Sequence, residues 1–194
     1  MGSYAQTVAP TSLAVSLDEV KQHCAVAGIT DHDAYLASLI EVATATVEAR
    51  TTRQIMPATW TLTLEGFPAE IRIHKPPVSA ISSVQYYDED EDLQTLSTDD
   101  YQTDYVSDDR AARIKPIDGV AWPTTASGTY GAVVVTFTTG YSSATEVPAI
   151  LRHAIKFLVA HWFAMREPVT FGATTSIPEG LGMLLGLGDW GCYL

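Results

Sequence analysis

One apolar segment near the C-terminal end constrains the fold of this chain more than any other feature. Pro148 opens the segment and Pro168 closes it, because proline is tolerated in a first helical turn and stops a helix later. One face follows helical spacing and consists of Ile150, Leu151, Ala154, Ile155, Leu158 and Trp162. Since Phe157, Val159 and Phe163 make the other faces apolar too, the helix must be buried inside its own domain or between subunits.

Two more helices are predicted near the N-terminus, after residues 1–15, which we expect to be a flexible arm. Ser16–Glu19 has the pattern of a capping box, and Gly28 supplies a stop. Thr30–Asp33 is a second start signal, for a helix that reaches about Thr52. Two helices joined this tightly form an αα-hairpin. We expect helical core or subunit packing by Leu36, Ile40, Val47, Leu151, Ile155, Leu158 and Trp162.

The pattern changes to strands in the middle of the chain. Residues 59–64 alternate polar and apolar side chains, and residues 132–138 form the clearest strand of all. Several short strands follow one another without an intervening helix, which requires antiparallel pairing. The sequence therefore predicts an α+β fold, in which an N-terminal αα-hairpin and a long C-terminal helix form a helical core that carries an inserted antiparallel β region.

The expected organisation has four parts. Residues 1–15 form the flexible arm, and residues 16–53 and 146–167 form the helical core. Residues 54–145 form the β insertion, and residues 168–194 form a C-terminal docking arm.

The composition predicts no enzyme and no cofactor. A formal net charge of −12 argues against ordinary binding of a nucleic-acid backbone, although it permits a protein that surrounds DNA without gripping it. Only His153 and His161 share a helix, at a spacing unsuited to a metal, and no nucleophile elbow or phosphate loop occurs. Arg166 and Glu167 interrupt the longest apolar run, so no membrane span is expected.

One acidic segment resembles the opening of a calcium loop. Asp88, Asp90 and Asp92 have the D-x-D-x-D spacing, but Leu93 stands where such a loop needs glycine and Asp99 where it needs glutamate. These three aspartates are weak metal candidates. We expect instead a charged hairpin tip that discourages edge pairing, and a calcium-binding or carbohydrate-binding β module remains an alternative.

The C-terminal segment is rich in glycine and leucine. Its interior glycines make it a poor autonomous helix, so its apolar residues either dock onto a partner or fold back onto their own domain. The candidate docking residues are Ile177, Leu181, Leu184, Leu185, Leu187 and Trp190.

The order of these signals resembles the head–tail connector (adaptor) family of long-tailed bacteriophages, prophages and gene transfer agents. The matching blocks, spread over residues 16–167, are Ser16–Lys21, Ala45–Thr52, Trp60–Pro68, Ile71–Asp88, Arg113–Pro116, Trp122-Pro123, Val133–Tyr141 and Pro148–Glu167.

This resemblance implies a structural protein that forms a ring, commonly of twelve copies, beneath the portal of a virion. Its partners would be other copies of itself, the portal protein and a tail-side neck or tail terminator protein, with the docking arm contacting portal or tail. Genomic DNA would pass through the ring without sequence-specific binding. The ring would lie in the virion neck after assembly in the host cytoplasm. A tail-completion or stopper protein of similar size is the alternative.

Overall fold

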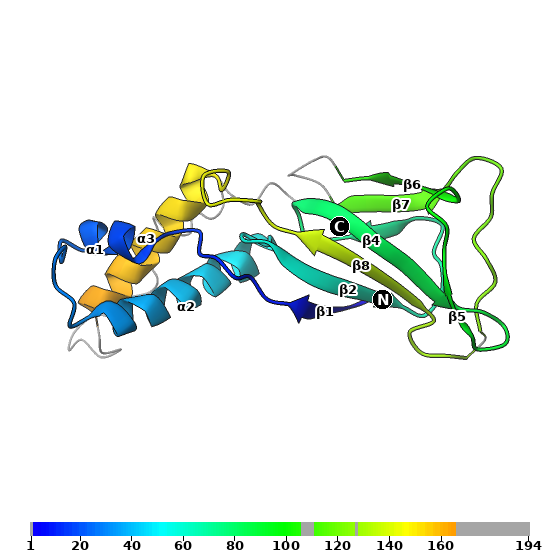
Figure 1. Cartoon of the computed structure of the whole chain (residues 1–194), viewed down its shortest axis with the longest axis horizontal. Coiled ribbons are helices and arrows are strands. Elements are labelled where there is room, and N and C mark those ends of the chain that lie inside the picture. The colour runs from blue at the N-terminus through cyan, green and yellow to red at the C-terminus, as the bar shows by residue number, and fades with distance from the viewer. Residues whose placement is uncertain (1, 106–110, 127, 166–194) are drawn as a thin grey trace, which may run out of the picture. The chain divides into compact units, whose positions relative to one another are not determined.

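The computed structural model describes residues 2–105, 111–126 and 128–165 of the 194-residue chain. Within these limits the chain forms two compact units (Figure 1). Residues 12–55 and 142–165 make a helical unit, and residues 2–11 and 56–141 make a β unit. The predicted α+β class, with helices segregated from antiparallel strands, is confirmed.

The helical unit consists of α1 (Leu17–His23), α2 (Asp33–Thr51) and α3 (Ala149–Ala164). The predicted capping box is present: the Glu19 backbone N–H donates to Ser16 Oγ at 3.2 Å, and the Ser16 N–H donates to Glu19 Oε2 at 2.9 Å. These bonds satisfy two N–H groups that have no partner inside the helix. The proline at position 148 occupies the N-cap of α3, as its place in the sequence predicts.

Apolar faces of α2 and α3 pack together to form the core of this unit. The buried residues are Leu36, Ile40, Ala43, Val47 and Thr51 of α2 and Leu151, Ala154, Ile155, Leu158 and Val159 of α3. The Lys21 ammonium, on α1, lies 2.7 Å from the Asp33 carboxylate at the start of α2. The short α1 is therefore joined to α2 by an ion pair as well as by apolar contact.

Glu48 ties the end of α2 to the segment that follows it. Its Oε1 accepts hydrogen bonds from the Ile55 backbone N–H at 2.8 Å and from Gln54 Nε2 at 2.7 Å. Both Gln54 and Ile55 are buried, so water cannot replace this acceptor. The Glu48 carboxylate thus helps to hold the bend after α2.

We expect Glu48→Ala to lower the free energy of unfolding by about 1–3 kcal/mol, because a buried N–H group loses its acceptor. Urea unfolding followed by circular dichroism measures the loss. Glu41→Ala, an exposed position on the same helix, is the matched control and should change stability by less than about 0.5 kcal/mol. Equal effects of the two substitutions would contradict this role of Glu48.

Among the described residues of the β unit, eight strands form two antiparallel sheets. In sheet order, the five-stranded sheet contains β1 (Ser3–Val8), β2 (Ala58–Leu64), β8 (Val133–Thr139), β4 (Val78–Tyr87) and β5 (Leu93–Thr95). The three-stranded sheet contains β3 (Ile71–Ile73), β7 (Ala112–Pro116) and β6 (Tyr101–Asp104).

The two sheets share one apolar core. Its buried side chains come from both, and are Leu62, Ile71, Ile73, Val78, Val84, Tyr101, Ala112, Ile114, Val133, Val135 and Phe137. Along β8 every second residue is buried, which is the alternation that the sequence predicts. The β unit is therefore a small sandwich in which β8 is the central strand of the larger sheet.

The prediction of a flexible arm over residues 1–15 is wrong for Ser3–Val8. These residues form the edge strand β1, with Ser3 opposite Thr63 and Gln6 opposite Trp60 of β2. Most side chains of β1 are exposed, so no alternation of apolar residues marks the strand in the sequence. Backbone hydrogen bonds to β2 hold it in the sheet, and these leave no signature in residue type.

Candidate assembly surfaces

The expected helical packing residues divide into buried and partly exposed positions. Leu36, Ile40, Val47, Leu151, Ile155 and Leu158 are all buried within the helical unit. Trp162 is only half-buried, as are Phe157 and Phe163. Near the end of α3, Phe163 contacts His32 and Tyr35, with ring centroids 5.4 and 6.2 Å apart. The apolar stripe of α3 is thus buried from Leu151 to Val159, whereas the aromatic side chains Phe157, Trp162 and Phe163 stay partly open to solvent.

The outer face of α2 is also free of charge along most of its length. The exposed residues on this face alternate at spacings of three and four, and are Tyr35, Ser38, Val42, Ala45 and Ala49. Val42, a β-branched apolar residue, is 55% exposed on this face. We call this set, together with Phe157 and Trp162 of α3, the apolar helical surface.

Residues 88–92, which we call the acidic tip, form the turn between β4 and β5. Asp88 Oδ1 accepts hydrogen bonds from the Asp90 N–H at 3.1 Å and the Asp92 N–H at 3.0 Å. Asp88 Oδ2 accepts a third from Gln94 Nε2 at 2.7 Å. The bond from Gln94, with those from the two backbone groups, lowers the pKa of the Asp88 carboxyl.

The carboxylate of Asp88 therefore shapes the turn, which is the usual role of aspartate in such loops. Glu89, Asp90, Glu91 and Asp92 are exposed around it. Among the described residues, no group of three or more His, Cys, Asp or Glu side chains is arranged to hold a metal ion. Asp88 thus has a defined structural role in the hairpin turn.

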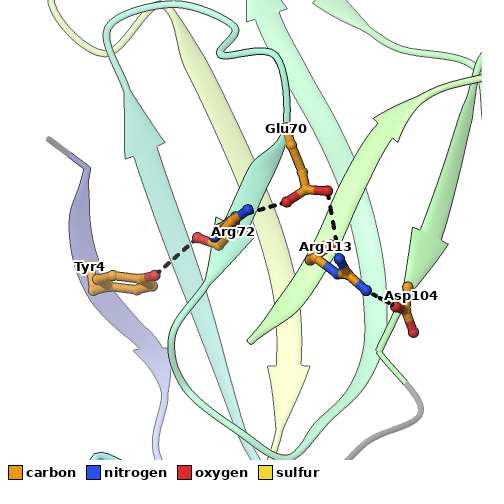
Figure 2. A network of polar contacts seen from close by, with 5 residues as sticks. All are labelled: Tyr4, Glu70, Arg72, Asp104 and Arg113. Atoms are coloured by element: carbon orange, nitrogen blue, oxygen red, sulfur yellow. Dashed lines mark hydrogen bonds and ion pairs between the residues drawn. The ribbon is translucent and has the colours of Figure 1, made fainter. Parts of the chain in front are cut away.

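A polar surface covers the outer side of the three-stranded sheet (Figure 2). Arg72 of β3 lies opposite Arg113 of β7, and Arg113 lies opposite Asp104 of β6. Glu70 Oε1 accepts from Arg72 Nε at 2.7 Å, and its Oε2 lies 4.0 Å from Arg113 Nη1. Arg113 Nη2 donates to Asp104 at 2.7 Å, and the hydrogen bond and charge of Asp104 raise the pKa of Arg113.

Lys115 extends this surface along β7. A shallow depression of about 250 Å³ lies here, lined by Glu70, Gln102, Thr103, Asp104, Arg113 and Lys115. We call Arg72, Arg113 and Lys115 the basic face. Our sequence reasoning did not identify it, although Arg113 and Lys115 stand two residues apart in a strand, the spacing that places both side chains on one face.

Two histidines lie close together where α1 contacts α3. His23 and His153, on α1 and α3, have ring centroids 6.1 Å apart. Burial lowers the pKa of His23, and the nearby His153 and Lys156 lower it further. The lowered pKa favours the neutral form of the His23 imidazole, whose ring meets that of His153 edge-on.

Two further predictions concern the C-terminal docking residues and the absence of a membrane-spanning helix. Ile177, Leu181, Leu184, Leu185, Leu187 and Trp190, the candidate docking residues, lie outside the described residues. None of the helices among residues 2–105, 111–126 and 128–165 is long and apolar enough to cross a bilayer.

Comparison with solved structures finds this fold in particle necks. A chain described as "Neck of empty GTA particle computed with C6 symmetry" superposes with a TM-score of 0.80 at 22% identity, covering 99% of this chain and 97% of that chain. A chain from "Virion of native gene transfer agent (GTA) particle" gives 0.79 at 22% identity, covering 98% and 97%. A chain from "Neck of native GTA particle computed with C12 symmetry" gives 0.78 at 20% identity, covering 99% and 97%.

At these identities the similarity establishes a common fold over almost the whole length of both chains. None of the curated protein sequences matches this chain. Residues 14–109 match the sequence profile described as "Phage gp6-like head-tail connector protein". This chain therefore belongs to the phage gp6-like head–tail connector family.

Proposed function

We propose that this protein is the structural head–tail connector of a phage-like particle, acting without catalysis. In this role it forms a ring beneath the portal that joins the capsid to the tail. The observation that carries the proposal is the connector profile over residues 14–109. The fold supports it, because a chain from a particle neck matches nearly the entire length of this one.

The apolar helical surface supports assembly into a ring. Apolar side chains that stay open to solvent on α2 and α3 are candidates for burial against a neighbouring copy. Val42, Phe157 and Trp162 are open or half-open to solvent in the single chain. A contact of two different surfaces on neighbouring copies closes into a ring when the rotation allows it. A ring of twelve copies agrees with the C12 symmetry under which one similar neck was computed.

The charge of the chain suits a passage for DNA. With Lys and Arg numbering 11 against 23 Asp and Glu, the protein carries a net charge of −12. Each phosphate that a protein neutralises releases counterions and adds affinity, which would oppose sliding of the genome. An acidic ring therefore lets DNA move through without sequence-specific binding.

Electron microscopy of the purified protein with and without a portal protein tests this function. We expect rings, either of the protein alone or assembled on the portal. A protein that stays monomeric and does not bind the portal protein would refute the proposal. The layer that the subunit occupies between head and tail distinguishes a connector from a tail-completion or stopper protein.

Residues 168–194 are the proposed attachment arm to the portal or to a tail-side neck or terminator protein. We expect deletion of residues 169–194 to preserve the unfolding transition of the remaining chain and to abolish or strongly weaken attachment. Thermal unfolding and co-sedimentation with portal measure the two effects.

A second variant keeps the full length of the chain and replaces Leu181, Leu184, Leu185 and Leu187 with serine. It should weaken attachment in the same direction if the leucines make the contact. Should the truncated chain unfold instead, the segment belongs to the core and the attachment role is wrong.

A further inference from the structure

Charge is segregated within the β unit. Its described residues include four Lys and Arg side chains, Arg72, Lys75, Arg113 and Lys115. Lys75 lies over the Trp60 ring, 3.9 Å from its centroid. The other three make up the basic face, where they outnumber the two neighbouring carboxylates, Glu70 and Asp104. In a chain of net charge −12, the basic face therefore carries a local excess of positive charge.

The basic face retains unused hydrogen-bond donors. Arg72 engages Glu70 through Nε alone, and its side chain is 62% exposed. Lys115 forms no ion pair with another described residue. The ion pairs of Glu70 and Asp104 fix the guanidinium groups on the surface, so little side-chain freedom remains to be lost on binding.

The acidic tip has the complementary properties. Among the described residues, no Lys or Arg forms an ion pair with Glu89, Asp90, Glu91 or Asp92. The three hydrogen bonds to Asp88 hold the turn in one shape, so the free carboxylates are presented without the cost of ordering a loop. Leu93, which follows the tip, is 53% exposed and would be covered by a partner docked at the tip.

We propose that the basic face of one copy receives the acidic tip of the neighbouring copy. Both surfaces belong to one chain but occupy different places on it, which is the arrangement that produces a head-to-tail contact. Exposed ion pairs contribute little affinity individually. Charged surfaces instead exclude wrong orientations, because like charges repel. We therefore expect this contact to set how neighbouring copies are oriented, while the apolar helical surface supplies most of the affinity. The inference rests on the proposed ring.

Charge reversal tests the contact. One variant carries Arg72→Glu and Lys115→Glu; Arg113 is kept because it is bound by Asp104 and Glu70. The other carries Glu89→Lys and Asp90→Lys; Asp88 is kept because it holds the turn. Each variant should weaken ring formation by roughly tenfold or more, because it places like charges together. The measurement is sedimentation velocity under conditions in which the unaltered protein forms rings, alone or on portal.

The decisive part of the test is whether ring formation is restored when the two charge reversals are combined. In an equimolar mixture of the two variants, and in one chain carrying all four substitutions, every tip again meets a face of opposite charge, so ring formation should return. Glu65→Lys with Asp118→Lys, two exposed positions outside both surfaces, controls for net charge and should leave assembly unchanged. Thermal unfolding checks that each variant is folded.

A zero-length carbodiimide cross-linker supplies an independent readout. In rings made from heavy-isotope and light chains, Lys115 of one chain should link to the acidic tip of another. Rings that survive both reversals, or that show no such link, would overturn this contact and leave the connector function standing. If the unaltered protein forms no ring even with portal, the proposed function fails and the contact fails with it.

Discussion

Replacing Phe137 with alanine is expected to lower the free energy of unfolding by about 3–5 kcal/mol, the usual cost of removing a buried aromatic side chain. Phe137 is fully buried on β8, in the core that both sheets share. Its ring meets Tyr4 of β1 edge-on, with centroids 6.4 Å apart. The substitution would therefore leave a cavity in the sandwich and also remove a contact that holds the edge strand.

Urea unfolding followed by tryptophan fluorescence measures this loss, because Trp60 lies directly opposite Phe137 on β2. Thr136→Ala provides the control on the same strand, since the Thr136 side chain points away from the core and is partly exposed. The control should cost less than about 1 kcal/mol. A Phe137→Ala protein as stable as the control would show that the sheets do not share the core described here.

Gly140→Ala is expected to cost at least about 2–4 kcal/mol, because two penalties combine at this position. Gly140 has φ of 110°, a conformation that residues with a side chain rarely adopt. A Cβ atom added there would also overlap the Met56 carbonyl group. The Gly140 N–H donates to the Pro77 carbonyl at 2.9 Å, so the backbone cannot move aside without breaking a bond.

Gly119→Ala separates the two penalties. Gly119 has a similarly positive φ of 83°, but a Cβ atom there would meet nothing within 4 Å. This control should therefore show the conformational cost alone, about 1–2 kcal/mol. Thermal unfolding of both variants gives the comparison, and a Gly140→Ala loss no larger than that of Gly119→Ala would contradict the close approach to Met56.

Elements whose signals lie within a few residues were predicted well. The capping box of Ser16 and Glu19 and the proline before α3 act within one helical turn, and the structure has both. The alternation along β8 is equally local. In each case the residue types themselves provide the bonds or the apolar face, so their order predicts the element.

Features that depend on distant partners were missed. β1 exists because its backbone pairs with β2, more than fifty residues later, and its exposed side chains carry no trace of that pairing. The basic face arises only when β3, β7 and β6 align Arg72, Arg113 and Asp104 in one row. Trp162 lies on the same face of α3 as Leu158 but is only half-buried near the end of the helix, and its role in core or subunit packing stays a prediction.

The amino-acid sequence by itself determined the α+β class, the division of the chain into helical and β parts, and the apolar character of the helix after Pro148. It could do so because periodicity and capping are local properties. Only the tertiary structure decided which face of that helix its own unit covers, where the edge strand lies, and how the few cations of the β unit gather. These outcomes follow from backbone pairing and strand register, which join residues far apart in the chain. The surfaces available for assembly are therefore a product of the fold.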